Sequence, residues 1–205
     1  MELLSSIRRN SLGLGIFAVL TAGLIAVTHQ LTDHTIKENI LHAQISAFNE
    51  ILPADLYDND LTKDIAVLPV DPLLGSENGT KIHIARKGSQ VTGIIFETTA
   101  TRGYNGNLDM LVAINRDGVV TGSRVISHKE TPGLGDKVDL KKSDWILSFA
   151  DKSLTNPDLK GWGVKKDGGD FDQFTGATIT PRAVVRAVKN TLLYFDQNKA
   201  TLLAR

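Results

Sequence analysis

An uncharged segment near the N-terminus limits the possible folds more than any other feature of the chain. Residues 11–28 contain no Asp, Glu, Lys or Arg and are mostly Leu, Ile, Val, Ala, Phe and Gly. With Asn10 and His29 the uncharged run reaches about 20 residues, which is long enough to cross the hydrocarbon core of a bilayer as a helix. Because no water reaches that core, the backbone of a single crossing must be helical. We therefore predict a transmembrane anchor over residues 10–30.

The charges around this segment predict its orientation. Arg8 and Arg9 precede it, and the next basic residue is Lys37. The positive-inside rule then places residues 1–9 in the cytoplasm as a short tail and the bulk of the chain on the other side of the membrane. A cleaved signal peptide is the alternative. It agrees less well with the sequence, because the apolar core of a signal peptide is only about 7–15 residues long and no convincing small-x-small cleavage site follows the run.

The composition excludes several classes of function. The chain of 205 residues contains 23 Lys+Arg and 23 Asp+Glu, so its formal net charge is +0 and we expect no nucleic-acid partner. It contains no Cys, which rules out disulfides, thiolate zinc sites and cysteine-ligated iron–sulfur clusters in this chain. Its five His residues form no ligand-like cluster, and no Gly-x-Ser-x-Gly elbow occurs. We therefore expect neither a metal site nor a hydrolase.

The residues after the anchor predict one soluble domain. Residues 31–53 are expected to form a membrane-proximal amphipathic helix, because Leu41, Ile45, Phe48 and Leu52 fall on one helical face before Pro53. Residues 55–78 are interspersed with Asp, Asn, Pro and Gly and are typical of a loop. The remaining chain, taken as residues 54–205, is long enough for a single domain on the extracytoplasmic side.

Strand and helix patterns place this domain in the α+β class. Alternating or β-branched runs surround two short turns, which predicts two hairpins. Their strands are residues 81–86 with 90–98, and 107–115 with 119–127. A tight turn at residues 103–106 carries Tyr104 between the hairpins, and helices are expected at residues 139–152 and 181–198. Antiparallel strands followed by helices indicate an α+β fold behind the single transmembrane helix.

The last helix is preceded by a loop of small and hydroxyl-bearing residues. Residues 172–180 read Asp-Gln-Phe-Thr-Gly-Ala-Thr-Ile-Thr and are followed by Pro181. Thr180 is expected at the N-cap and Pro181 at the first helical position. The start of a helix presents free N–H groups and a positive dipole end, which suits a phosphate. On spacing alone, however, these threonines are better explained as caps and turn-formers.

A second stretch has a backbone that could approach a flat ligand. Residues 128–136 read His-Lys-Glu-Thr-Pro-Gly-Leu-Gly-Asp. The glycines lack a Cβ and tolerate positive φ, so the chain here can pass close to a planar group. Taken alone, the stretch is simply a loop.

Together the two stretches resemble a known family. Asp-x-x-Thr-Gly-Ala-Thr at 172–178 resembles the Asp-x-x-(Ser/Thr)-Gly-Ala-Thr signal of flavinylated proteins, and Glu-Thr-Pro-Gly-Leu-Gly at 130–135 resembles the flavin-contacting loop of the covalent FMN-binding domain family. Asp-Trp at 144–145 and Val-Lys-Lys-Asp-Gly-Gly-Asp at 164–170 also match. Over nearly its whole length the chain is similar to the G subunits of the Rnf (also called Rsx) electron transport complexes of bacteria.

This resemblance implies a cofactor, partners and a location. A separate, Mg-dependent flavin transferase would join FMN to Thr178 through a phosphoester, since a threonine hydroxyl is a poor nucleophile and no obvious base lies near it in the sequence. The chain would be a redox carrier of the inner membrane rather than a free-standing enzyme. Its complex would couple electron transfer between ferredoxin and a nicotinamide pool to ion movement.

The resemblance also implies a set of site residues. The attachment loop comprises Thr175, Gly176, Ala177, Thr178 and Thr180, and the ring would lie against the loop that contains Thr131, Gly133, Leu134 and Gly135. Trp145 and then Tyr104 are expected as the wall beside the ring, although Trp145 is also well explained as a core residue. Lys165 or Lys166 could neutralise the phosphate, and a solvated surface position explains either lysine equally well.

Two other functions remain compatible with the sequence. The C subunits of the sodium-pumping NADH:quinone reductases share the threonine motif, but they form a family of longer proteins. The chain could also be an unflavinylated extracytoplasmic adaptor, in which the threonines act only as helix caps and turn residues.

Overall fold

The computed structural model describes the backbone of residues 2–205 and, within the first helix, leaves the side chains of residues 2–5, 34 and 36–44 outside the description. The chain divides into two compact units, Met1–Gln44 and Ile45–Arg205. The α-helix α1 (Glu2–Ile51) forms the first unit and contributes its last residues to the second. Leu41, which was predicted to lie on the apolar face of the membrane-proximal helix, is therefore among the residues whose side chains are not described.

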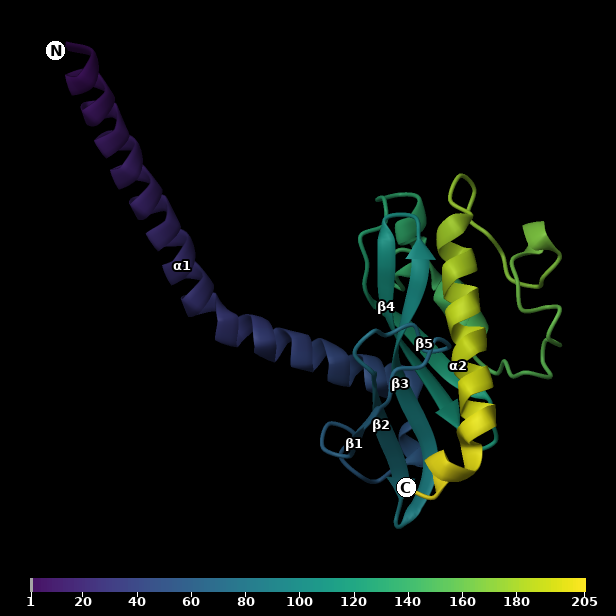
Figure 1. Cartoon of the computed structure of the whole chain (residues 1–205). Helices are drawn as coiled ribbons and strands as arrows, with labels where there is room; N and C mark the ends of the chain where they lie inside the picture. The colour runs from purple at the N-terminus through teal and green to yellow at the C-terminus, as the bar shows by residue number, and fades with distance from the viewer. Residues whose placement is uncertain (1) are drawn as a thin grey trace. The chain divides into compact units, whose positions relative to one another are not determined.

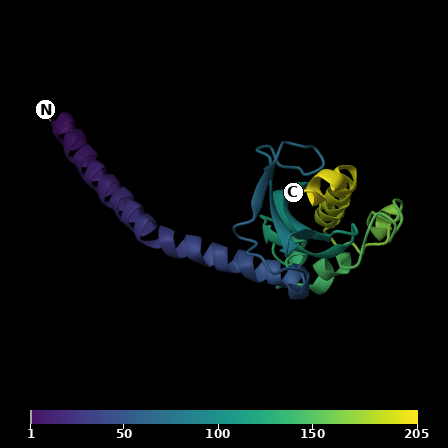
Figure 2. The ribbon, with the colours of Figure 1, turned by 90° about the horizontal axis from the view of Figure 1, so that it is seen from below.

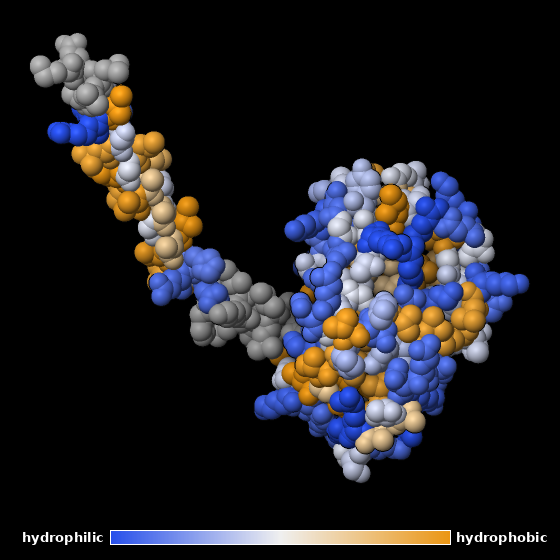
Figure 3. Space-filling model, in the orientation of Figure 1, coloured by the Kyte–Doolittle hydropathy of each residue, from blue (hydrophilic) through white to orange (hydrophobic). Residues whose placement is uncertain are grey.

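The apolar part of α1 satisfies its own polar groups. Residues Ser6–Asp33 form a segment of 28 residues with a mean hydropathy of 2.1, long and apolar enough to cross a membrane, and Figure 3 shows apolar side chains around it. The hydroxyls of Thr21, Thr28 and Thr32 each donate to a carbonyl of the preceding turn, at 2.9, 2.8 and 2.8 Å. Each hydroxyl thus has a hydrogen-bond partner within the helix and needs none from water, which is absent from the hydrocarbon core of a membrane.

The second unit is built on a five-stranded antiparallel meander. Its strands follow one another in space in the order β1-β2-β3-β4-β5 (Figure 1). They are β1 (Ile65–Leu68), β2 (Thr80–Lys87), β3 (Gln90–Gly103), β4 (Gly106–Asn115) and β5 (Val120–Ser127). Both predicted hairpins are confirmed, with Ile84 opposite Ile94 and Val112 opposite Ser123. Strand β1 lies in the region expected to be a loop, because four residues are too few to show a clear alternation.

The sheet is covered on both faces. Alternate residues of β3 point to opposite sides, so Ile94 and Phe96 join one core while Ile95 joins another. The first core lies under the α-helix α2 (Ile179–Leu203), which runs along one face of the sheet and contributes Val188 and Phe195 (Figures 1 and 2). The second core is formed with the end of α1, which contributes Ala47, Phe48 and Ile51.

The end of α1 is bonded to β5 as well as packed on the sheet. Thr121 Oγ1 donates to the carbonyl of Ile51 at 2.6 Å, and Arg124 Nε lies 3.0 Å from Glu50 Oε2. A Cβ on Gly122 would lie 2.7 Å from Ile51 Cα, so only glycine allows this approach. The last turn of α1 is therefore an integral part of the C-terminal unit.

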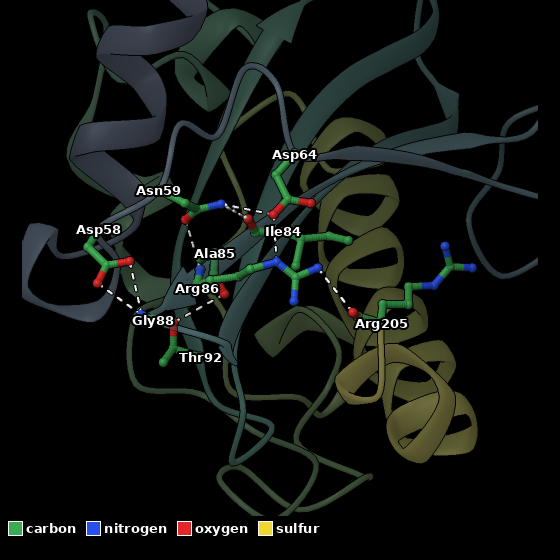
Figure 4. A network of polar contacts seen from close by, with 9 residues as sticks. All are labelled: Asp58, Asn59, Asp64, Ile84, Ala85, Arg86, Gly88, Thr92 and Arg205. Carbon is green, nitrogen blue, oxygen red and sulfur yellow. Dashed lines mark hydrogen bonds and ion pairs between the residues drawn. The ribbon is translucent and has the colours of Figure 1, made fainter.

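A polar network attaches residues 54–64 to the edge of β2. The guanidinium of Arg86 contacts Asp64 at 2.6 Å and the main-chain oxygen of Arg205 at 3.1 Å. Asn59 donates to the carbonyl of Ile84 and accepts from the N–H of Arg86, both at 2.8 Å (Figure 4). This segment is thus held to the sheet and to the end of α2.

The prediction of an α-helix over residues 139–152 is wrong. The structure has only the 3-10 helix η3 (Asp144–Phe149) there, after the 3-10 helix η2 (Gly135–Val138). Asp139 accepts from the N–H of Lys141 at 3.0 Å, and Ser143 accepts from the N–H of Trp145 at 3.2 Å. These short side-chain bonds give the backbone an alternative to a continuous helix. The other 3-10 helices are η1 (Ala54–Leu56) and η4 (Lys165–Asp167).

Candidate functional site

The threonine motif contains a tight turn that depends on glycine. Ala177 N donates to the carbonyl of Phe174 at 3.1 Å, which closes a four-residue turn. Gly176, the third residue of that turn, has a φ of +80°. Positive φ at this position is the mark of a type II turn and is readily adopted only by glycine. Gly176 is therefore required by the geometry of the loop that leads into α2.

Helix α2 begins earlier than the sequence predicted. Its first residue is Ile179 and its N-cap is Thr178, so the assignment of Thr180 to the N-cap and Pro181 to the first helical position is wrong. Arg182 N donates to the carbonyl of Thr178 at 3.3 Å. Thr178 already has helical dihedral angles and its half-buried side chain makes no capping bond. Its hydroxyl is thus left for other chemistry at the positive end of the helix.

Thr180 does not cap the helix because it has a partner elsewhere in the chain. Its buried Oγ1 donates to Glu130 Oε2 at 2.6 Å. The other oxygen of the same carboxylate accepts from Asn105 N at 3.2 Å, and Asn105 Nδ2 donates to Thr131 Oγ1 at 3.1 Å. Glu130 is only 5 % exposed. It therefore joins the β3–β4 turn, the 130–135 loop and the start of α2 in one buried connection.

Glycines allow these segments to approach one another. A Cβ on Gly135 would lie 2.6 Å from Glu130 Oε2 and 2.8 Å from Thr180 Oγ1. A Cβ on Gly103 would lie 2.7 Å from Glu130 Oε1. On the outside of the same contact, Leu134 Cδ2 lies 3.6 Å from the Cβ position of Gly176. The structure thus brings together the two stretches that the sequence singled out.

Trp145 lies beside the motif, whereas Tyr104 is exposed at the tip of a turn. The indole packs edge-on against Phe174 at 5.1 Å and Phe149 at 5.3 Å, and its Nε1 donates to the carbonyl of Asp172 at 2.8 Å. Tyr104 is 66 % exposed at the tip of the β3–β4 turn, and among the described residues it has no ring partner. Trp145 therefore serves as a core residue and also as a support for the motif.

Trp145 also lines a surface pocket of about 470 Å³. Asp172, the first residue of the motif, is part of its wall, together with Leu147, Ser148 and Phe171. Thr178 is not among its lining residues. We therefore locate the candidate site from the contacts between the two loops and do not centre it on this pocket.

The charged residues near the motif are arranged in two ion pairs. Lys165 Nζ lies 2.7 Å from Asp172 Oδ1, and Arg182 holds Asp167 through two contacts of 2.5 Å. The hydrogen bond from Arg182 holds the pKa of Asp167 below its ordinary value. Lys166 is exposed, and its backbone N–H donates to Gln173 Oε1 at 3.0 Å. Arg182 was missed from the sequence, although it lies one helical turn after Thr178 on the same face.

One carboxylate oxygen in the second loop is buried without a hydrogen-bond partner among the described residues. Asp136 is 6 % exposed, and its Oδ1 has no hydrogen-bond partner among the described residues. A buried charge without a partner is costly, so such an atom suggests that a donor is supplied from outside the chain. Asp136 was also missed from the sequence, where its position directly after the Gly-Leu-Gly run is the one available signal.

Comparison with known proteins agrees with this geometry. Residues 1–51 match the family model of the RnfG N-terminal region, and residues 103–193 match that of the FMN-binding domain. The chain is 48 % identical over 203 residues to the G subunit of the ion-translocating oxidoreductase complex of Vibrio atlanticus, covering 99 % of this chain and 97 % of that one. It is 48 % identical over 194 residues to the corresponding protein of Yersinia pestis, covering 95 % and 92 %.

The chain belongs to the family of G subunits of Rnf-type complexes. A third member of this RnfG family, from Shewanella oneidensis, is 44 % identical over 197 residues, covering 96 % of this chain and 93 % of that one. The FMN-binding match includes Glu130, the 131–135 loop, Trp145 and the motif around Thr178. The residues of this RnfG-family chain fit FMN in two respects: a threonine hydroxyl without a capping bond stands at a helix start, and a buried carboxylate oxygen lacks a donor.

Proposed function

We propose that this protein is a membrane-anchored electron-transfer subunit that carries FMN covalently on Thr178. The observation that supports the proposal most directly is the position of Thr178, at the N-cap of α2 with no capping bond, inside the region matched by the FMN-binding domain. The family motif and the local structure thus point to the same hydroxyl. Bound FMN supplies reversible one- and two-electron redox chemistry.

The chain's own residues would hold the phosphoester by charge and dipole. The first N–H groups of α2 have no intrahelical partner and point away from the helix start, where a phosphate is stabilised. The exposed Lys166, and Arg182 one turn further along in its ion pair with Asp167, would add positive charge near this end. Thr175, Gly176 and Ala177 are small residues in the turn before Thr178, and two of them are exposed, so a transferase could reach this hydroxyl past them.

The remaining site residues would position the isoalloxazine ring. Thr131, Gly133, Leu134 and Gly135 form the loop that meets Gly176, and Thr180 secures that loop through Glu130. Trp145 would support the ring from the motif side, with Tyr104 as the alternative at the β3–β4 tip. A tethered cofactor cannot be lost by dissociation, which leaves the protein to set its orientation and potential.

We further propose the partners and the location. Residues 10–30 would span the bacterial inner membrane, with residues 1–9 in the cytoplasm, residues 31–53 near the lipid surface and residues 54–205 in the periplasm. A flavin transferase would attach the FMN. The other subunits of the complex would deliver and accept its electrons, in a sequence that couples ferredoxin and NAD to ion translocation.

The direct test is flavin fluorescence in a denaturing gel. The full chain is expressed with an active flavin transferase, denatured, separated and illuminated. We expect a fluorescent band that disappears in Thr178→Ala and is unchanged in Thr201→Ala, an exposed threonine near the other end of α2. Fluorescence that survives in Thr178→Ala would refute the site.

The gel and a co-purification experiment separate the alternative functions. A dark wild-type band, with the transferase active on a control protein, would leave the unflavinylated adaptor. Purification with the components of a sodium-pumping quinone reductase instead of an Rnf complex would indicate the function of the quinone-reducing relatives.

A further inference from the structure

One oxygen of the Asp136 carboxylate is buried without a hydrogen-bond partner among the described residues. Among the described residues, the buried side-chain atoms without a hydrogen-bond partner are Thr80 Oγ1 and Asp136 Oδ1. An unpaired hydroxyl costs far less than an unpaired carboxylate, because the carboxylate carries a charge. The buried Oδ1 of Asp136 therefore lacks a donor among the described residues, and a group from outside the chain could supply one.

The location of Asp136 connects this defect to the flavin site. Its neighbour Gly135 is in contact with Glu130 and Thr180, and Leu134 contacts Gly176 in the turn of the threonine motif. Asp136 is therefore part of the loop that meets the motif. By contrast, the nearby carboxylate of Glu130 has two partners, Thr180 and Asn105, so it needs nothing further.

We propose that Asp136 accepts a hydrogen bond from an N–H or O–H group of the covalent FMN. The inference rests on the proposed function and adds a binding residue to it. FMN has donors of both kinds: the imide N3–H of the ring and the hydroxyls of the ribityl chain. A charge-assisted bond to either one would supply the partner that Asp136 lacks and would make flavinylation stabilise the fold.

The test compares the effect of flavinylation on two full-length variants. Wild type and Asp136→Asn are each prepared with and without an active flavin transferase, in the same detergent, and their thermal midpoints are measured. Asp144→Asn is the matched control, because Asp144 is exposed at the start of η3. Flavinylation should raise the midpoint of wild type and of Asp144→Asn by several degrees, and that of Asp136→Asn by clearly less. Without flavin, Asp136→Asn should be at least as stable as wild type, because Oδ1 has no hydrogen bond to lose.

An alkaline titration of the flavin absorbance identifies the donor. If the ring N3–H donates, the negative charge of Asp136 opposes its deprotonation, so Asp136→Asn should shift the titration to lower pH. If a ribityl hydroxyl donates, the titration should stay in place while the loss of stabilisation remains. Both results support the proposal.

Three results would overturn it. Equal increments on flavinylation in wild type and Asp136→Asn would show that the flavin does not contact this residue. A lower midpoint of Asp136→Asn without flavin would show that the carboxylate already has a partner. Stabilisation of unflavinylated wild type by Mg²⁺, absent in Asp136→Asn, would identify a cation instead. A wild type that carries no flavin at all would refute the proposed function as well, and the gel shows this separately.

Discussion

Thr180 Oγ1 lies 2.6 Å from Glu130 Oε2, across 50 residues of sequence, and both side chains are buried. This bond connects the loop proposed to contact the flavin with the helix that follows its attachment residue. It also explains why Thr180 is not a helix cap, since its hydroxyl is already used. The bond thus connects the two loops of the site, together with the hydrogen bonds of Asn105 to Glu130 and Thr131.

Breaking this bond should destabilise the C-terminal unit. Thr180→Val leaves the buried Glu130 carboxylate one partner short, and a hydrogen bond to a charged group contributes about 1.5–3 kcal/mol. We expect a loss of that size in the free energy of unfolding, measured by denaturant titration. Flavinylation should also slow, because the two loops lose their common support.

A double-mutant cycle with Glu130→Gln isolates the contact. The two changes should be non-additive by about 0.5–3 kcal/mol, as is usual for residues in contact. If the double variant loses the simple sum of the single losses, the bond does not support the site.

Gly176→Ala should impair flavinylation. Alanine at a φ of +80° is strained by roughly 1–2 kcal/mol, so the turn before Thr178 should shift to another geometry. The fluorescent fraction in a denaturing gel should fall. Gly88→Ala is the matched control, because Gly88 has a φ of +62° in the turn between β2 and β3 and its added Cβ meets no atom. That control should lose similar stability and keep its flavin; equal loss of flavin in both variants would contradict the prediction.

Glu97 should make the stability of the C-terminal unit sensitive to acid. Its carboxylate lies 2.9 Å from Nε2 of the buried His83 and 3.4 Å from Lys81. Burial raises the pKa of Glu97, but the hydrogen bond from His83 and the charges of Lys81 and His83 outweigh this effect and leave the pKa below its ordinary value. The folded state therefore binds fewer protons than the unfolded state, and the contact stabilises the fold fully above the unfolded pKa.

This stabilisation should be lost as the pH falls below about 4.3 and through the lowered folded pKa. In Glu97→Gln the decline of stability with acid should be shallower than in wild type, as measured by denaturant titration at several pH values. Asp117→Asn, at an exposed turn, should retain the wild-type slope. An unchanged slope in Glu97→Gln would show that this contact does not respond to acid.

Gly122→Ala should loosen the end of α1 from the sheet. The added Cβ would lie 2.7 Å from Ile51 Cα and 2.9 Å from the Ile51 carbonyl oxygen, and both are backbone atoms that cannot move independently. Overpacking of this kind costs about 1–3 kcal/mol. Thermal unfolding and limited proteolysis near Pro53 should report the change.

Gly163→Ala is the appropriate control, since its Cβ would meet nothing nearer than 3.8 Å. If both variants show the same thermal midpoint and the same rate of proteolysis, an added Cβ at Gly122 is tolerated and the packing of β5 against α1 is not tight.

The local parts of this protein were predictable from sequence because their signals are local. An uncharged run of helical length predicts the apolar segment of α1, and alternation around Lys87-Gly88-Ser89 and Arg116-Asp117-Gly118 predicts both hairpins. The order of residues in the 172–178 motif also indicated the family that the comparisons show. Each of these signals lies within a short window of the chain.

Only the tertiary structure decided where α2 begins and which groups are buried. Thr180 is a good cap by type, but a carboxylate far away in sequence takes its hydroxyl, and Thr178 becomes the N-cap. Asp139 and Ser143 form local bonds that prevent the expected helix, and Oδ1 of Asp136 is buried without a partner among the described residues. The sequence by itself determined the apolar helix, the two hairpins and the motif, because periodicity and turn chemistry act between neighbours. The choice among competing hydrogen-bond partners depends on which distant segments meet, and that is set only when the chain is folded.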